Sequence, residues 1–97
     1  YNNYGELIFE GYYLNGNKNG REKEYKDGKL IFEGVYLNGE RNGEGKEYHW
    51  NGKLIFEGEY LKGERNGKGK EYKDDELIFE GDYLNGERWN GNGKLKT

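Results

Sequence analysis

The best candidates for catalytic residues in this sequence are pairs of acidic side chains that lie close together along the chain. Glu22 and Glu24 lie two residues apart, and Asp74 and Asp75 are adjacent. Two carboxylates that face one glycosidic bond can hydrolyse it, one as the acid and the other as the base or nucleophile. Most carboxylates in this sequence, however, alternate with lysine or arginine along polar segments. We therefore expect them to form opposite-charge pairs across a polar sheet face, and we expect no catalytic pair.

The other reactive side chains are too few for an active site. The chain has no serine or cysteine, one threonine (Thr97) and one histidine (His49). Nucleophilic catalysis needs a nucleophile beside a base, and a transition-metal site usually needs several His or Cys ligands. The acidic run 74–76 lacks the spacing of a calcium loop, and no Gly-x-Gly pair joins a strand to a helix as a phosphate loop does. The sequence therefore predicts a protein that is not an enzyme and uses no metal or cofactor.

The charge balance argues against nucleic acid as a partner. The formal net charge is −3 at pH 7 and the isoelectric point is about 5.3, whereas nucleic-acid-binding domains are usually basic. The densest group of lysines is Lys68, Lys70 and Lys73, and Glu71 interrupts it. Anionic membranes attract clusters of roughly four to eight basic residues. Binding to membrane lipid is therefore expected to be weak at most.

A repeat of about 23 residues dominates the sequence. Leu-Ile-Phe-Glu-Gly begins at Leu7, Leu30, Leu54 and Leu77. Each copy continues through Tyr-Leu into a turn that contains glycine, and a second Asn-Gly pair follows it. We assign residues 1–97 to a single array, with repeats at about 7–29, 30–53, 54–76 and 77–97 and with residues 1–6 as its N-terminal edge.

Each repeat has the features of a β-hairpin. Residues 30–37 are rich in β-branched and aromatic side chains, and residues 43–48 form a more polar second segment. Asn-Gly pairs such as Asn38-Gly39 are a strong signal for a tight hairpin turn. The links between repeats are short too, which forces successive strands to run antiparallel. The sequence therefore predicts an all-β fold, an elongated single-layer antiparallel β-meander of about eight strands.

One face of this sheet is expected to be packed and the other to be wet. Side chains alternate along a strand, so Leu30, Phe32, Gly34 and Tyr36 share one face, and this set is identical in all four repeats. On the other face, the position of Val35 is occupied by tyrosine or an acid in the other copies. Glycine weakens a strand unless a ring lies over it or a bulge requires it. We favour rings over most of the strand glycines, with bulges as the alternative.

The spacing Phe-x-Gly-x-Tyr-x-x-Gly-x-x-x-Gly-x-Gly, seen from Phe32 to Gly45 and again from Phe56 to Gly69, resembles the MORN repeat. The resemblance covers nearly the whole chain and also extends to MORN-like repeats of bacteria. It departs from the pattern in the first copy, where Glu22 replaces a glycine, and in the fourth, where Trp89 is inserted and the Lys-Glu-Tyr close is missing. The resemblance implies a single-layer sheet of hairpins with an aromatic-lined groove, which acts as a non-catalytic scaffold.

Several roles fit such a scaffold. The first is a groove that binds another protein, and the second is self-assembly as a dimer or end to end. Docking to membrane phospholipid is the alternative implied by the resemblance, and a platform of stacked rings for a small ligand or glycan is a further one. The arginines Arg41, Arg65 and Arg88 recur at one position, where we favour a solvated or ring-stacked residue over a row for an acidic partner. The candidate groove and anchor residues are Phe9, Tyr13, Phe32, Tyr36, Phe56, Tyr60, Phe79, Tyr83, Trp50 and Trp89.

Overall fold

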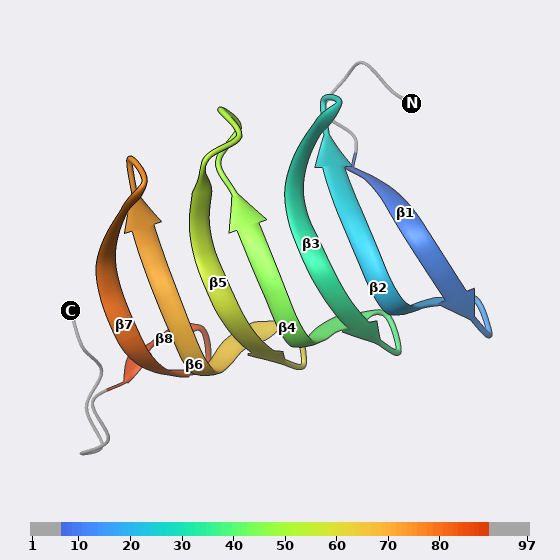
Figure 1. Ribbon diagram of the computed structural model, residues 1–97. Coiled ribbons are helices and arrows are strands. Elements are labelled where there is room, and N and C mark those ends of the chain that lie inside the picture. The colour runs from blue at the N-terminus through green and yellow to red at the C-terminus, as the bar shows by residue number, and fades with distance from the viewer. Residues whose placement is uncertain (1–6, 90–97) are drawn as a thin grey trace.

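The fold is an open sheet whose strands follow one another in chain order. The computed structural model describes residues 7–89, and these form one 8-stranded antiparallel sheet ordered β1 to β8 (Figure 1). The principal extents are 43 × 32 × 18 Å. The predicted all-β single-layer meander is therefore confirmed. The strands are β1 (Leu7–Leu14), β2 (Asn17–Lys26), β3 (Lys29–Leu37), β4 (Glu40–Tyr48), β5 (Leu54–Leu61), β6 (Glu64–Lys73), β7 (Glu76–Leu84) and β8 (Glu87–Trp89).

Two-residue turns close the hairpins. The φ angles of Asn38 and Gly39 are 52° and 85°, the left-handed values that a type I′ turn requires at both central positions. Asparagine tolerates this conformation, and glycine has no Cβ to oppose it. Equivalent turns occur at residues 15–16, 62–63 and 85–86. Because each turn holds only two residues, β4 already begins at Glu40, earlier than the segment 43–48 predicted for the second strand.

The second Asn-Gly pair of each described repeat lies inside a strand. Gly43 and Gly67 have φ angles of 103° and 93°. The pairing of β3 with β4 shifts register between Gly34 and Tyr36, opposite Gly43. Extra residues in one strand of a pair form a bulge, where glycine is favoured. The bulge explanation therefore holds for this set of glycines.

Other strand glycines line up in a row that crosses the sheet, and aromatic rings cover this row. A Cβ atom added to Gly45 would lie 2.6 Å from the ring of Phe32 and 2.9 Å from that of Tyr60. The space that a side chain would fill is therefore taken by the rings, as in the favoured explanation. Neighbouring strands pair through Gly11, Glu22, Gly34, Gly45, Gly58, Gly69 and Gly81, in that order.

The strands bend over this glycine row and enclose the core. Phe32 and Tyr36 are four residues apart, which would separate them by about 13 Å in a straight strand. Their ring centroids are only 6.0 Å apart, and Figure 1 shows the curvature in β3, β5 and β7. The bend gathers the rings of successive repeats into one cluster. Its buried members, 0–5% exposed, are Phe32, Tyr36, Phe56, Tyr60 and Tyr83.

The predicted packed face is therefore correct for the Phe, Gly and Tyr positions of the inner repeats and only partly correct for the Leu position. Leu7 and Leu77, in the two end repeats, are 50% and 49% exposed, whereas Leu30 and Leu54 are half-buried. On the opposite face Tyr12 and Glu59 are exposed, as predicted for a wet face. Across residues 7–89, the search for a helix able to cross a membrane finds none.

Candidate binding surfaces

The repeats are joined by a contact of three side chains, which we call the repeat junction. Tyr36 in the second repeat donates its hydroxyl hydrogen bond to the Glu24 carboxylate of the first repeat. Arg41 donates to both oxygens of Glu24, at 3.1 Å from Nε and 3.2 Å from Nη2. The guanidinium of Arg41 also lies 3.9 Å from the ring centroid of Phe32. Bidentate pairing of this kind fixes geometry and adds strength.

The junction recurs between the following repeats. Tyr60 and Arg65 bind Glu47, and Tyr83 and Arg88 bind Glu71. Each arginine also stacks on the phenylalanine of its own repeat. The ring-stacked alternative for the arginine row is therefore confirmed. The arginine side chains are only 24–28% exposed, so the description of them as solvated turn residues is wrong.

Tyrosines in the junction hold their protons more firmly than free tyrosine. Burial is the larger cause, and the hydrogen bond to Glu47 the next cause, of the raised pKa of Tyr60. The pKa of Tyr83 is raised in the same way, by burial and by its hydrogen bond to Glu71. Burial opposes ionisation of Glu47, but hydrogen bonds from Arg65 and Tyr60 outweigh it and lower its pKa. In Glu71 the hydrogen bond from Arg88 is the largest cause of a lowered pKa. These shifted pKa values thus belong to residues whose contacts join the repeats.

These shifts predict a stability plateau with a fall at each end of the pH scale. Glu47 and Glu71 have folded pKa values below the ordinary 4.5, so the stability they add is complete above that pH and is lost as the pH falls through the folded values. Tyr60 and Tyr83 have pKa values above the ordinary 10.0, so their contribution is complete below pH 10 and is lost as the pH rises beyond it. The midpoint of thermal unfolding, followed by circular dichroism, should therefore decline below about pH 4.5 and above about pH 10.

A matched pair of variants separates this effect from general charge repulsion. Tyr60→Phe removes a junction hydroxyl and should reduce the alkaline decline, whereas Glu44→Gln removes one exposed negative charge from the charged face and should leave the decline unchanged. Equal pH profiles for both variants and the parent chain would contradict the assignment.

The ten predicted site residues do not form one open surface. Five of them are the buried rings named above, and Phe9 and Phe79 pack partly against those rings. Tyr13 and Trp50 are 57% and 66% exposed. Trp89 is half-buried at the end of β8, opposite Asp82. Most of the predicted groove residues are thus packed against one another, and Tyr13 and Trp50 are the two with large exposed surfaces.

The widest accessible surface is the charged face of the sheet, on the side away from the aromatic rings. There, a row of alternating Glu and Lys residues crosses the sheet from strand to strand. Lys46, for example, lies opposite Glu33 on one side and Glu57 on the other. The tyrosines that close the repeats donate hydrogen bonds to the glutamates of this row. Tyr48, for example, donates to Glu33 at 2.7 Å, and burial together with that bond raises the pKa of Tyr48 to about 12. The members of the row are Glu10, Lys23, Glu33, Lys46, Glu57, Lys70 and Glu80.

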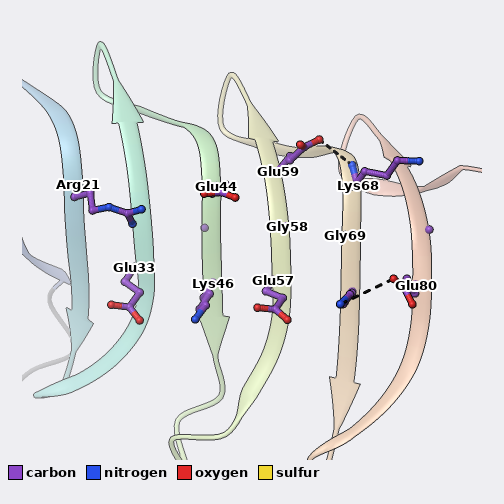
Figure 2. Close-up of a pocket in the computed structure, with 13 residues that line it drawn as sticks. Arg21, Glu33, Glu44, Lys46, Glu57, Gly58, Glu59, Lys68, Gly69 and Glu80 are labelled. Atoms are coloured by element: carbon purple, nitrogen blue, oxygen red, sulfur yellow. Dashed lines mark hydrogen bonds and ion pairs between the residues drawn. The ribbon is translucent and has the colours of Figure 1, made fainter.

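This charged face is hollowed along the glycine row. Figure 2 shows charged side chains from β2 to β7 around the hollow, which has a volume of about 870 Å³. Glycines including Gly45, Gly58 and Gly69 line its floor, and Lys70 forms an ion pair of 4.0 Å with Glu80 in its wall. Both signs of charge alternate here, so the hollow offers no cationic patch. The expected opposite-charge pairing across a polar face is present in this row.

The loop between β4 and β5 breaks the pattern of two-residue links. It spans residues 49–53 and carries Trp50, whose ring centroid lies 5.1 Å from that of His49. The Lys29 ammonium lies 5.4 Å from the Trp50 ring. A second hollow of about 480 Å³ lies here, lined by Lys29, Leu30, Tyr48, Trp50, Asn51 and Gly52. The hollow is thus lined by the exposed ring of Trp50, the aliphatic side chain of Leu30 and the cation of Lys29.

Two of the carboxylates expected to form opposite-charge pairs on a polar sheet face are buried on the aromatic face instead. Glu24 is 3% exposed and belongs to a repeat junction, and Glu22 is 2% exposed in the glycine row. Oε2 of Glu22 accepts a 2.7 Å hydrogen bond from the Tyr12 backbone, and its Oε1 has no partner among the described residues. Beside Glu22 the Phe9–Tyr36 centroid distance is 6.2 Å, against 5.3 Å for Phe32–Tyr60 beside Gly45. The Glu22 carboxylate lies over Gly11, where a Cβ added to the glycine would come within 2.5 Å of it. The place of Glu22 in a glycine position of the repeat was the signal for this difference.

Some predictions fall outside residues 7–89, namely the N-terminal edge at 1–6 and the altered close of the fourth repeat after Trp89. Within the described part of the chain, no group of three or more His, Cys, Asp or Glu residues could hold a metal ion. The chain matches no protein-family model, and a search of curated proteins finds no match either.

Proposed function

We propose that this chain is a non-catalytic scaffold of the MORN-repeat type, which presents its surface to another protein or to itself. The hairpin meander, the motif spacing and the stacking of each repeat on its neighbour all support this class of protein. In such arrays each unit contacts only its neighbours, and the extended surface serves for binding.

A non-catalytic role is supported by the contacts that the titratable groups with shifted pKa values make. Strongly shifted pKa values often mark active sites, but ion-pair networks that serve structure also produce them. Here the shifted groups on the aromatic face are the Tyr, Glu and Arg of the repeat junctions. Their polar atoms bind one another across neighbouring repeats, so the chemistry they support is cohesion of the array.

The exposed Trp50 loop is the observation on which the binding role rests. Tryptophan is enriched among residues that dominate protein interfaces, and Trp50 is 66% exposed beside a hollow. The other described links between strands hold two residues and no aromatic ring. We therefore place the principal contact with a partner protein at this loop, where an apolar side chain of the partner fills the hollow and an acidic neighbour meets Lys29.

Affinity capture tests this role. The immobilised chain is exposed to an extract of the cells from which the sequence comes, and retained proteins are quantified by mass spectrometry. Trp50→Ala should reduce recovery of the main partner about tenfold or more, as expected for an interface hot spot. Leu37→Ala, a change at a 49% exposed residue of a hairpin end, is the matched control and should leave recovery unchanged.

Equal recovery by the parent chain and Trp50→Ala would refute the assignment of the loop. Sedimentation with vesicles of anionic phospholipid tests the lipid alternative in the same preparation. The mixed signs on the charged face lead us to expect no binding, and salt-sensitive binding to these vesicles would favour lipid docking over the protein partner.

A further inference from the structure

In the part of the chain that the structure describes, the edge of β1 that faces away from β2 is open, whereas the equivalent edge in the other repeats is covered by a preceding strand. In β3, β5 and β7 the equivalent edge is paired with the preceding strand over the length of the hairpin. Among the described residues no strand pairs with that edge of β1. Within residues 7–89 no preceding repeat packs on its tyrosine: Tyr13 is 57% exposed, whereas its counterparts Tyr36, Tyr60 and Tyr83 are buried.

This edge lacks the features that usually prevent strands from pairing. Natural proteins protect edges with lysine, proline or very short strands. The eight residues of β1, Leu-Ile-Phe-Glu-Gly-Tyr-Tyr-Leu, carry one charge and neither lysine nor proline. Four of them, Leu7, Tyr12, Tyr13 and Leu14, are at least 50% exposed. By contrast β8, the strand at the other end of the sheet, has three residues, two of them charged.

The sequence of β1 is complementary to itself around Gly11. If two copies of β1 lie antiparallel with Gly11 opposite Gly11, then Phe9 faces Tyr13 of the second copy. On the other face Ile8 lies opposite Leu14, and Glu10 lies opposite Tyr12. The chain already uses tyrosine hydroxyls as donors to this row of glutamates, as from Tyr48 to Glu33. Aromatic and β-branched pairs directly opposite one another are the favourable contacts of antiparallel sheets.

We propose that two copies of this chain associate through β1 in this register and form one continuous sheet about a two-fold axis at Gly11. Such an isologous contact is closed, because each copy uses the same patch and neither β1 edge is left for a third copy. The second copy supplies the ring that Tyr13 lacks. It also pairs the open backbone groups of β1, which is the strand addition by which sheet edges commonly bind.

This contact gives a specific form to the self-assembly in the proposed function, but it does not use the Trp50 loop. Trp50→Ala should therefore leave association of the two copies intact while it reduces capture of the partner protein. The two proposals can fail separately.

Two variants that place opposite charges at the exposed position 12 test the proposed register between the two copies of β1. Sedimentation equilibrium of the full chain should give a dimer that dissociates on dilution. Tyr12→Glu places a glutamate opposite Glu10 twice in each dimer and should weaken the dimer about tenfold. Tyr12→Lys places a lysine there and should retain or strengthen it. The third repeat carries Glu59 at the equivalent position, so the fold accommodates the acidic variant.

Disulfide formation gives an independent readout, because the chain has no cysteine of its own. The variants Glu10→Cys and Tyr12→Cys should crosslink to each other in a mixture under mild oxidation, and much less when each is oxidised alone. A chain that stays monomeric at every concentration, or the same loss of dimer in Tyr12→Glu and Tyr12→Lys, would overturn the proposal. A monomer would leave the edge of β1 to a strand from a different protein.

Discussion

Gly58→Ala is expected to destabilise the chain by about 3 kcal/mol, a large share of the roughly 5–15 kcal/mol that holds a small domain folded. The added Cβ would lie 2.5 Å from the Lys68 carbonyl oxygen and 2.7 Å from Cα of Gly69. Both atoms belong to the backbone of β6, which cannot move away without breaking the pairing of β5 with β6. The ring of Phe56, 2.9 Å away, blocks the remaining direction. Urea unfolding followed by circular dichroism measures the loss.

Gly81→Ala is the matched control from the same glycine row. There the nearest atoms to an added Cβ, at 2.9, 3.5 and 3.6 Å, all belong to the ring of Phe79. A side chain can turn aside where a strand cannot, so the expected cost is only about 1 kcal/mol. Equal losses for the two variants would show that crowding by the neighbouring backbone does not explain the glycine row.

Glu47→Ala is expected to cost about 3 kcal/mol, because it breaks a repeat junction. The Glu47 carboxylate accepts from the hydroxyl of Tyr60 and from two nitrogens of Arg65, at 3.0 and 3.1 Å. Its removal leaves a mostly buried hydroxyl and a guanidinium, 24% exposed, with no carboxylate between them. The carboxylate itself is 20% exposed, which places the cost at the lower end of the range for buried pairs.

Two further variants show whether charge or shape matters. Glu47→Gln keeps an acceptor of the same size and should cost about half as much, since hydrogen bonds to neutral groups are weaker. Glu44→Ala removes an exposed glutamate of the same strand on the charged face and should change stability by less than about 0.5 kcal/mol. If Glu47→Ala is as mild as Glu44→Ala, then the junction does not hold the repeats together.

Some sites were indicated by the repeat pattern of the sequence, and others could be found only from the folded structure. Trp50 and Glu22 both interrupt the repeat, and the structure places one in an exposed loop and the other in a buried glycine row. The repeat junction was not foreseen, although its members recur at fixed spacing. Tyr36 and Arg41 bind Glu24 of the preceding repeat, and the sequence alone does not indicate which repeat supplies the partner.

The hairpin meander, its turns and the face that carries Phe and Tyr could all be predicted from the pattern of residues. These features depend on local rules: side chains alternate along a strand, Asn-Gly favours left-handed turns, and short links force neighbouring strands to pair. The enclosure of the rings and the burial of Glu24 depend instead on how the whole sheet is assembled. Enclosure depends on the bend at the glycine row, which brings Phe32 and Tyr36 to 6.0 Å. A bend summed over several strands is a property of the assembled sheet, and no single repeat contains it.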